Sequence, residues 1–280
     1  MLAVQKAIQI CPLSSSFIRR IAMMETLDFL YPSSSFITTM SMINILGLSF
    51  FGFLEMMGIN LQYSKLWNPN SKRIKVSSRT GMLLLYTPAF LVGFASFWIF
   101  PEKGFRPLLV TTALTIHFFK RVLEVLFVHK YSGGMVLDSI ILISSGYSTT
   151  TATMIHAQHI AQGFMEPAID LKCPGILLFS VGICGNFYHH YLLSKLRGKG
   201  EKGYKIPKGG LFHQVICPHY LFEILEFVGV FFISQTLYSL SFTISTTLYL
   251  IGRSYATRKW YISKFENFPR ETKALIPYIF

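Results

Sequence analysis

The sequence predicts an all-α polytopic membrane protein, and three observations lead to this prediction. Of the 280 residues, 51% are hydrophobic and only 14% are charged. In soluble domains about a quarter of the residues are charged. The apolar residues fall in long runs, most of them near the ~20 residues that a helix needs to cross ~30 Å of hydrocarbon. Lys and Arg gather between these runs, as they do in the loops of membrane proteins.

The elements follow from the apolar runs, which are bounded by charged residues, proline or glycine. Seven runs cover residues 36–58, 81–100, 106–128, 134–154, 173–194, 215–234 and 237–252. The last run is the shortest, and only Gln235 and Thr236 separate it from the run before, so the two also fit one long interrupted span. We therefore predict about seven transmembrane helices, and the alternatives are six or eight.

Charge in the connections alternates along the chain. Five basic residues and no acid follow the first run, at Lys65, Lys72, Arg73, Lys75 and Arg79. Six basic residues and one acid lie between 195 and 208, and the tail from residue 253 carries six basic and two acidic residues. The connections between these segments are close to neutral. Under the positive-inside rule, this alternation predicts a lumenal N-terminus and a cytoplasmic C-terminus.

The net charge of +13 is compatible with nucleic acid, anionic lipid or an anionic cofactor as a partner. The apolar composition argues against nucleic acid. Four cysteines, Cys11, Cys173, Cys184 and Cys217, show no metal-binding spacing. We expect buried thiols, with neither a disulfide framework nor a metal site.

Residues 1–35 form an N-terminal extension with little structural signal. Arg19 and Arg20 among serines faintly resemble a transit peptide. The alternative, which fits equally well, is an extension without a targeting role, so that the functional part of the chain starts near Met23 or Met24.

Polar side chains in the last three runs, and in the residues that directly extend the fifth and seventh, repeat at helical spacing. Ionisable groups at membrane depth are costly, so they mark candidate functional positions. The three stripes are Asn186, His190 and Arg197; His219, Glu223 and Glu226; and Arg253, Thr257 and Tyr261. Residues three, four or seven apart share one helix face, so we expect one polar pocket near the cytoplasmic side. The alternative is that these residues only hydrogen-bond between helices or anchor helix ends.

Residues 198–203 match the pattern G-x-G-x-x-G, but they follow a membrane run and open no helix. We do not interpret them as a dinucleotide fingerprint. The cations of this loop and Tyr204 nevertheless suit an extended polyanion, such as the phosphates of a dinucleotide. A solvated loop is the alternative.

Four segments near the C-terminus carry a family resemblance. They are residues 186–197 (NFYHHYLLSKLR), 204–212 (YKIPKGGLF), 218–226 (PHYLFEILE) and 273–280 (KALIPYIF). In order and spacing they resemble the steroid 5α-reductase family, which includes 3-oxo-steroid 4-dehydrogenases, polyprenal reductase and trans-2-enoyl-CoA reductases. The first two thirds of the chain resemble the family only loosely.

The resemblance implies an NADPH-dependent reductase of the endoplasmic reticulum membrane, with seven helices that enclose a cofactor and substrate cavity. It divides the chain into an extension (1–35), substrate-side helices (36–170) and an NADPH-binding domain (171–280). The positions that match or line the family's cofactor site are Arg121, Asn186, Arg197, Tyr204, Lys205, His219, Glu223, Arg253 and Tyr261. The sequence departs from the family at His190, where Asp is common, and at Thr257, where His is common.

The chemistry that the resemblance implies is hydride addition to the β-carbon of an α,β-unsaturated carbonyl, with a donor that polarises the carbonyl oxygen. Steroid reductases place a Gln-Glu pair on the second helix and a Tyr on the third for this purpose. Here residues 84–88 (LLYTP) lack that pair, and Phe118 stands at the Tyr position. Tyr86 is our first candidate for the replacement donor and His117 the second.

A Δ4-3-oxo steroid is the favoured substrate, because the fifth-helix, loop and tail motifs look closest to that branch. An enoyl thioester of fatty acid elongation is the runner-up, and a polyprenyl aldehyde is third. A non-catalytic relative that binds sterol or nucleotide is the alternative from another class. We expect a lipophilic small molecule and membrane lipid as partners and no nucleic acid, and we make no prediction of oligomeric state.

Overall fold

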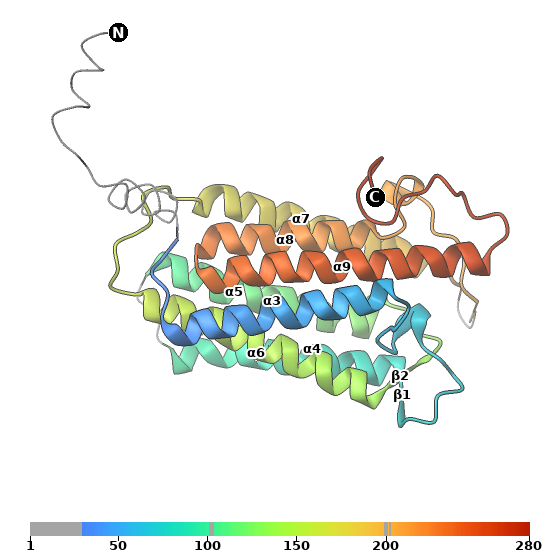
Figure 1. Cartoon of the computed structure of the whole chain (residues 1–280), viewed down its shortest axis with the longest axis horizontal. Coiled ribbons are helices and arrows are strands. Elements are labelled where there is room, and N and C mark those ends of the chain that lie inside the picture. The colour runs from blue at the N-terminus through green and yellow to red at the C-terminus, as the bar shows by residue number, and fades with distance from the viewer. Residues whose placement is uncertain (1–29, 101–103, 199–200, 202) are drawn as a thin grey trace, which may run out of the picture.

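The computed structural model describes residues 30–100, 104–198, 201 and 203–280, and within these ranges the chain is a bundle of long helices (Figure 1). The helices are α3 (Ser35–Met56), α4 (Ser78–Ile99), α5 (Phe105–Leu123), α6 (Leu137–Ala161), α7 (Lys172–Lys195), α8 (Pro218–Ser234) and α9 (Leu237–Lys264). Each overlaps one of the predicted apolar runs, so the predicted all-α class is confirmed. Among them α3, α4 and α7 are long and apolar enough to cross a membrane. The seven-span topology stays a prediction.

Several helices begin at capping residues that the sequence provides. The side chain of Ser34 accepts a hydrogen bond from the backbone amide of Ile37 at the start of α3. Ser77 does the same for Thr80 at the start of α4. These side chains satisfy backbone donors that have no partner within the helix, and so they fix where the helices start.

Several boundaries differ from the predicted runs by three residues or more. Strands β1 (Lys75–Ser77) and β2 (Gly134–Val136) pair antiparallel, so α6 begins three residues later than expected. Helix α9 continues to Lys264, well beyond the predicted end at 252, because polar residues continue its inner face where apolarity stops. Helix α5 passes into a π-helical turn, Glu124–Val128, before the connection to β2.

The turn between α8 and α9 settles one alternative from the sequence. Gln235 has a left-handed backbone conformation, with φ of 49°, and the side chain of Thr236 caps α9 at Ser239. The two helices pack against each other on either side of this turn. The interpretation of residues 215–252 as one interrupted span is therefore wrong.

Arg106 ties together the connections at the end of the bundle where α8 turns into α9. Its side chain is 1% exposed and donates hydrogen bonds to Glu166 Oε2 at 2.8 Å, to Asp170 Oδ1 at 2.9 Å and to the Ile233 carbonyl at 2.7 Å. A further bond of 2.7 Å reaches Gln235 Oε1. Burial opposes ionisation of Glu166, but the hydrogen bond and charge of Arg106 outweigh it and lower the pKa of this carboxyl. We call these residues the Arg106 clasp.

Glycines set the closest helix contacts. A Cβ added at Gly182 on α7 would lie 2.5 Å from the Glu226 amide nitrogen on α8. A Cβ at Gly252 on α9 would lie 2.1 Å from the Gly52 carbonyl oxygen on α3. Helices α7 and α8, and α3 and α9, therefore pack backbone to backbone, while α4 packs along α6.

The cysteine prediction is only partly right. Cys217 is buried, but Cys173 and Cys184 are exposed on α7. Apolar neighbours in the sequence predicted burial in the protein, whereas on a membrane helix they also occur on the outward face. Cys11 lies outside the described residues.

The long connections gather at one end of the bundle (Figure 1). The α3–α4, α5–α6 and α7–α8 connections and the C-terminal tail lie there, and the α6–α7 connection and the α8–α9 turn lie at the other end. Three of these four segments are the strongly basic ones that the sequence singled out. Most of the predicted extension, and Lys199, Gly200 and Lys202 of the glycine-rich loop, lie outside the described residues.

Candidate functional site

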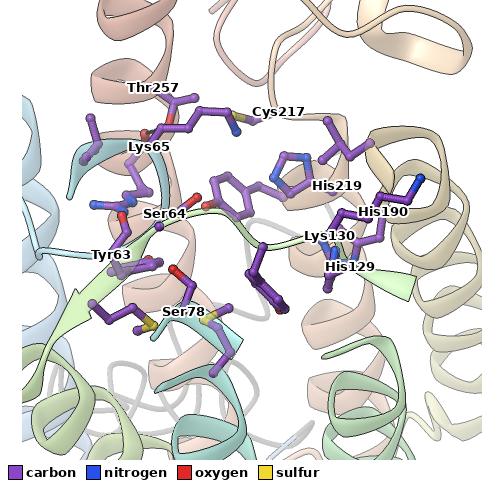
Figure 2. A pocket seen from close by; sticks show the side chains of 18 of the residues that line it. Tyr63, Ser64, Lys65, Ser78, His129, Lys130, His190, Cys217, His219 and Thr257 are labelled. Carbon is purple, nitrogen blue, oxygen red and sulfur yellow. Dashed lines mark hydrogen bonds between the residues drawn. The ribbon is translucent and has the colours of Figure 1, made fainter. Parts of the chain in front are cut away.

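A polar cavity lies at the end of the bundle where the basic connections gather (Figure 2). All but two of the site residues predicted from the sequence line it. They are Tyr86, Arg121, Arg197, Tyr204, Lys205, His219, Glu223, Arg253 and Tyr261. His190 and Thr257 from the predicted stripes line it as well. The structure thus brings residues from α4, α5, α7, α8, α9 and the α7–α8 connection to one place.

His117 and Asn186 are the two predicted residues that do not line the polar cavity. His117 Nδ1 lies 2.7 Å from Glu226 Oε1, and both side chains are buried. Asn186 accepts a hydrogen bond from Lys120 and donates one of 2.8 Å to the His219 carbonyl. Both therefore lie behind the cavity lining and position the helices that form it.

Tyr86 has the surroundings of a hydrogen-bond donor. Arg121 Nη2 donates to the Tyr86 hydroxyl oxygen at 2.5 Å, so the hydroxyl proton itself is not engaged by this bond. The Tyr147 ring stacks on the Tyr86 ring with centroids 5.9 Å apart and an angle of 12°. Since the guanidinium stabilises negative charge on the phenolic oxygen, the pair is suited to give a proton or a strong hydrogen bond.

Arg121 is fixed in turn by an ion-pair network. Its Nη1 lies 2.5 Å from Glu124 Oε2 and 2.8 Å from His190 Nδ1. Ligand atoms of Glu124, His129 and His190 all lie within 4.8 Å of one another, a spacing that a metal ion also requires. The guanidinium already engages Glu124 and His190, and its charge opposes a second cation there. We therefore interpret the group as the support of Arg121.

Arg197 and Tyr204 join the end of α7 to the connections around it. Arg197 donates to Ser132 Oγ at 2.5 Å and to the Lys130 carbonyl at 2.6 Å. Its guanidinium carbon lies 5.4 Å from the centroid of the Tyr204 ring. Arg197 thus holds the rim of the cavity in place as well as lining it.

Arg253 is 2% exposed and crosses from α9 to α3. It donates to Glu55 Oε1 at 2.8 Å, to the Leu61 carbonyl at 3.1 Å and to the Tyr63 carbonyl at 2.9 Å. The α3–α4 connection is therefore anchored to α9 by one side chain. Nothing in the sequence pointed to Glu55 as its partner, because the two residues are 198 positions apart.

Lys65 is a lining residue that the sequence analysis missed. It belongs to the 3-10 turn Ser64–Leu66, and its side chain extends toward Cys217 (Figure 2). Its Nζ lies 5.9 Å and 5.5 Å from the ring centroids of Tyr204 and Tyr261, and within the described ranges it has no hydrogen bond or ion pair. Burial lowers the pKa of Lys65. The sequence signal was the first basic connection, which we used only to predict topology.

Replacing Lys65 with methionine is expected to weaken binding of a phosphate-bearing ligand such as a dinucleotide, because an unpaired cation in a polar cavity is suited to bind phosphate. A hydrogen bond to a charged group contributes about 1.5–3 kcal/mol, which corresponds to a rise in Kd of about 10- to 100-fold. Fluorescence titration of the purified protein with NADPH measures this change. Lys208→Met is the matched control, since Lys208 is exposed and does not line the cavity. Equal affinities of Lys65→Met and wild type would contradict the assignment.

An apolar cavity lies next to the polar one. Residues of α3, α6, α8 and α9 line it, and it contains about 910 Å³ of space free of atoms, its open mouth included. Six residues line both cavities, and we call them the shared wall: Tyr63, Ile143, Tyr147, Glu223, Tyr249 and Leu250. In this wall the hydroxyls of Tyr63 and Tyr249 are 3.0 Å apart.

Several polar groups of the polar cavity have no protein partner in the described part of the chain. Glu223 has no hydrogen bond or ion pair there, and neither His219 Nδ1 nor the Tyr131 hydroxyl is hydrogen-bonded. Buried polar groups are normally satisfied, so His219 Nδ1 and the Tyr131 hydroxyl point to a polar ligand. The half-buried charges of Glu223 and Lys65 line the same cavity and add to its polarity. A dinucleotide, with phosphates, ribose hydroxyls and an amide, has matching chemistry.

Comparison with known proteins gives a consistent result. A family model described as 3-oxo-5-alpha-steroid 4-dehydrogenase matches residues 137–280. Steroid 5-alpha-reductase DET2 of Gossypium hirsutum is 40% identical over 107 residues, which are 38% of this chain and 42% of that relative. For 3-oxo-5-alpha-steroid 4-dehydrogenase 2 of Macaca fascicularis the identity is 39% over 108 residues, 39% of this chain and 42% of the relative. The match thus spans less than half the length of these curated relatives.

Proposed function

The chain belongs to the 3-oxo-5-alpha-steroid 4-dehydrogenase family, and on that premise we propose that it is an NADPH-dependent membrane reductase. Its reaction is the saturation of the carbon-carbon double bond of an α,β-unsaturated carbonyl lipid. The favoured substrate is a Δ4-3-oxo steroid. Two relatives of the chain carry names of this activity, which supports the choice.

The shared wall is the observation that carries the proposal. A polar cavity and an apolar cavity meet at Tyr63, Tyr147, Glu223 and Tyr249. A reaction between a water-soluble dinucleotide and a lipid requires two such sites in contact, each with the matching polarity. The reacting ends of the two molecules would meet at this wall, with the rest of each molecule in its own cavity.

NADPH, when bound, supplies the hydride. The residues that would hold it are Arg121, Asn186, Arg197, Tyr204, Lys205, His219, Glu223, Arg253 and Tyr261, to which the structure adds Lys65. Asn186 would act from behind the lining, through its bond to the His219 carbonyl. The free acceptor on Glu223 suits an amide or hydroxyl donor, and Lys65 suits a phosphate oxygen.

Tyr86 would polarise the substrate carbonyl as negative charge develops on its oxygen. Arg121 supports this role by donating to the Tyr86 oxygen at 2.5 Å. Phe118 is buried beside the Tyr147 ring, with centroids 5.4 Å apart, and offers no hydroxyl. His117 is our second candidate, but its bond to Glu226 behind the lining favours a positioning role.

We assign the protein to the endoplasmic reticulum membrane with a cytoplasmic C-terminus. The basic connections and the polar cavity lie at the same end of the bundle, so under the positive-inside rule the cavity takes its cofactor from the cytosol. Residues 36–170 would contribute mainly to the substrate side and residues 171–280 to the cofactor side.

The test is NADPH consumption by microsomes that express the chain, with product masses measured. Progesterone, as a Δ4-3-ketone, and a trans-2-enoyl-CoA are offered separately. We expect the steroid to gain two mass units, because saturation of its double bond adds a hydride and a proton. Reduction of the thioester alone would identify an enoyl-CoA reductase. NADPH binding without turnover on either would identify a non-catalytic relative.

A further inference from the structure

We propose that the end of the C-terminal tail is a membrane anchor. The side chains of Ile276, Tyr278 and Ile279, which we call the tail tip, enter the lipid leaflet on the side of the polar cavity. This contact holds the tail against the cavity wall, so the partner is the surface of a bilayer. The anchor goes beyond the proposed function, and only its effect on NADPH rests on that function.

The tail tip points away from the protein although it is apolar. Tyr278 is 81% exposed, Ile279 is 77% exposed and Ile276 is 36% exposed. Leu275 and Phe280, on either side of the tip, pack instead into an apolar cluster with residues of α9 and of the segment before α8. Exposed apolar groups gathered in this way mark a surface that another molecule or a membrane covers.

The backbone of the tail fixes this outward orientation. Tyr278 has a left-handed conformation, with φ of 64°, which is uncommon for an aromatic residue. The amides of Leu275 and Ile276 donate to the Phe280 carbonyl at 2.8 Å and 2.7 Å. The Phe280 amide donates in turn to the Ile276 carbonyl at 3.0 Å. These bonds close a tight loop, so turning the apolar side chains inward would require breaking it.

The tail returns from the end of α9 toward the helix bundle. Helix α9 runs on to Lys264, and the chain then turns back (Figure 1). The amides of Ile216 and Cys217, directly before α8, donate to the carbonyls of Lys273 and Ala274 at 2.9 Å and 3.1 Å. The tail therefore runs beside the start of α8 and does not extend beyond α9.

Helix α7 gives the depth of the tail tip. Gln214 Nε2 donates to the Tyr278 hydroxyl at 3.3 Å, and the amide of nearby Leu211 donates to His189 Nε2 at 3.2 Å. His189 lies six residues before the end of α7 at Lys195, which is about 9 Å along the helix. Because α7 is long and apolar enough to cross a membrane, the tip lies near the level of the membrane surface.

The side chains around the tail tip are those of a membrane interface. Tyr188 and Tyr191 on the same part of α7 are exposed, and tyrosines gather at this level of membrane proteins. The exposed Lys195 and Lys208 supply positive charge for lipid phosphates. Tyr278 itself combines an exposed ring with a hydrogen-bonded hydroxyl, an arrangement that suits the boundary between lipid and water.

The tail can act on the cofactor site because it backs the polar cavity. Cys217 lines this cavity, and its amide is bonded to the Ala274 carbonyl of the tail. Tyr261 also lines the cavity and belongs to the same apolar cluster as Leu275. A membrane contact that keeps the tail in place therefore supports this wall of the cavity. Two sites linked in this way are coupled, and the effect is reciprocal.

The first measurement is the depth of the tail tip in nanodiscs. A bimane label is attached to the cysteine of Ile279→Cys, and Glu266→Cys, in the exposed connection after α9, is the matched control. Both variants carry Cys11→Ser, Cys173→Ser and Cys184→Ser, and the same background without an added cysteine is the blank. We expect nitroxide lipids to quench the Ile279→Cys label at a depth of about 5–10 Å into the headgroup and acyl boundary. Iodide in the water should quench the Glu266→Cys label. Quenching of both labels by iodide alone would overturn the anchor.

The second measurement is the affinity for NADPH in the same nanodiscs. Ile279→Asp places a carboxylate at the tail tip, so we expect a Kd at least about fivefold higher, the lower end for coupling between two sites. Asn267→Asp adds the same charge to an exposed residue outside the tip and should leave the Kd unchanged. Equal Kd values for the two variants would overturn the hold of the membrane on the cavity. If wild type binds no NADPH, the proposed function fails. The depth measurement then still supports or overturns the anchor, since it needs no ligand.

Discussion

Tyr86→Phe is expected to lower kcat for enone reduction by about 100- to 1,000-fold, the usual effect of losing one donor to a developing oxyanion. The substitution removes only the hydroxyl that Arg121 orients at 2.5 Å. The ring stays in place, because it packs on Tyr147 in the core formed by α4, α5 and α6. Steady-state kinetics with progesterone, together with NADPH titration, measures the effect. NADPH affinity should remain near that of wild type.

Tyr131→Phe provides the control for this variant. Tyr131 also lines the polar cavity, but its hydroxyl has no partner among the described residues and is not oriented by Arg121. We expect its kcat to fall much less than that of Tyr86→Phe. Full activity of Tyr86→Phe would rule out Tyr86 as the donor. A matching loss of NADPH affinity would instead show that Tyr86 serves the cofactor.

Arg253→Ala is expected to destabilise the protein by about 3–5 kcal/mol, the range for removing one partner of a buried ion pair. Arg253 is 2% exposed and Glu55 is 1% exposed, so the variant leaves a carboxylate without its partner between α3 and α9. It also releases the carbonyls of Leu61 and Tyr63, which hold the connection that carries Lys65. We therefore expect lower NADPH affinity as well. Thermal unfolding in detergent and cofactor titration measure the two effects.

The double variant Arg253→Ala with Glu55→Gln separates charge from packing. Removing the unpaired carboxylate should recover part of the lost stability, because a neutral amide is less costly to bury than a charge. It should not restore NADPH affinity, since the α3–α4 connection stays released. An Arg253→Ala protein that melts at the wild-type temperature would contradict the role of this ion pair.

The sequence predicted the helices well because the signal is local. An apolar run of membrane length becomes a helix whatever surrounds it, since backbone groups in lipid have no other partner. The apolar run stops short of the end of α9 for the opposite reason. Beyond residue 252 the inner face is polar, with Arg253, Thr257 and Tyr261, so hydropathy stops while the helix continues.

The site was predictable where residues on one helix share a face, and not where distant segments meet. All residues of the stripes on α7, α8 and α9 except Asn186 and Glu226 line the polar cavity. The Arg253–Glu55 pair and Lys65 depend on how the α3–α4 connection folds against α9, which no local spacing encodes. The same holds for His117, whose contact with Glu226 is decided by the packing of α5 against α8.

The Arg106 clasp makes the two ends of the bundle mechanically unequal. One buried guanidinium joins the start of α5, the α6–α7 connection and the α8–α9 turn at the end away from the polar cavity. The end that carries the polar cavity is held by other side chains, from Arg253 to Glu55 and from Arg197 to the Lys130 carbonyl. The two ends of the bundle are therefore fixed by separate sets of contacts.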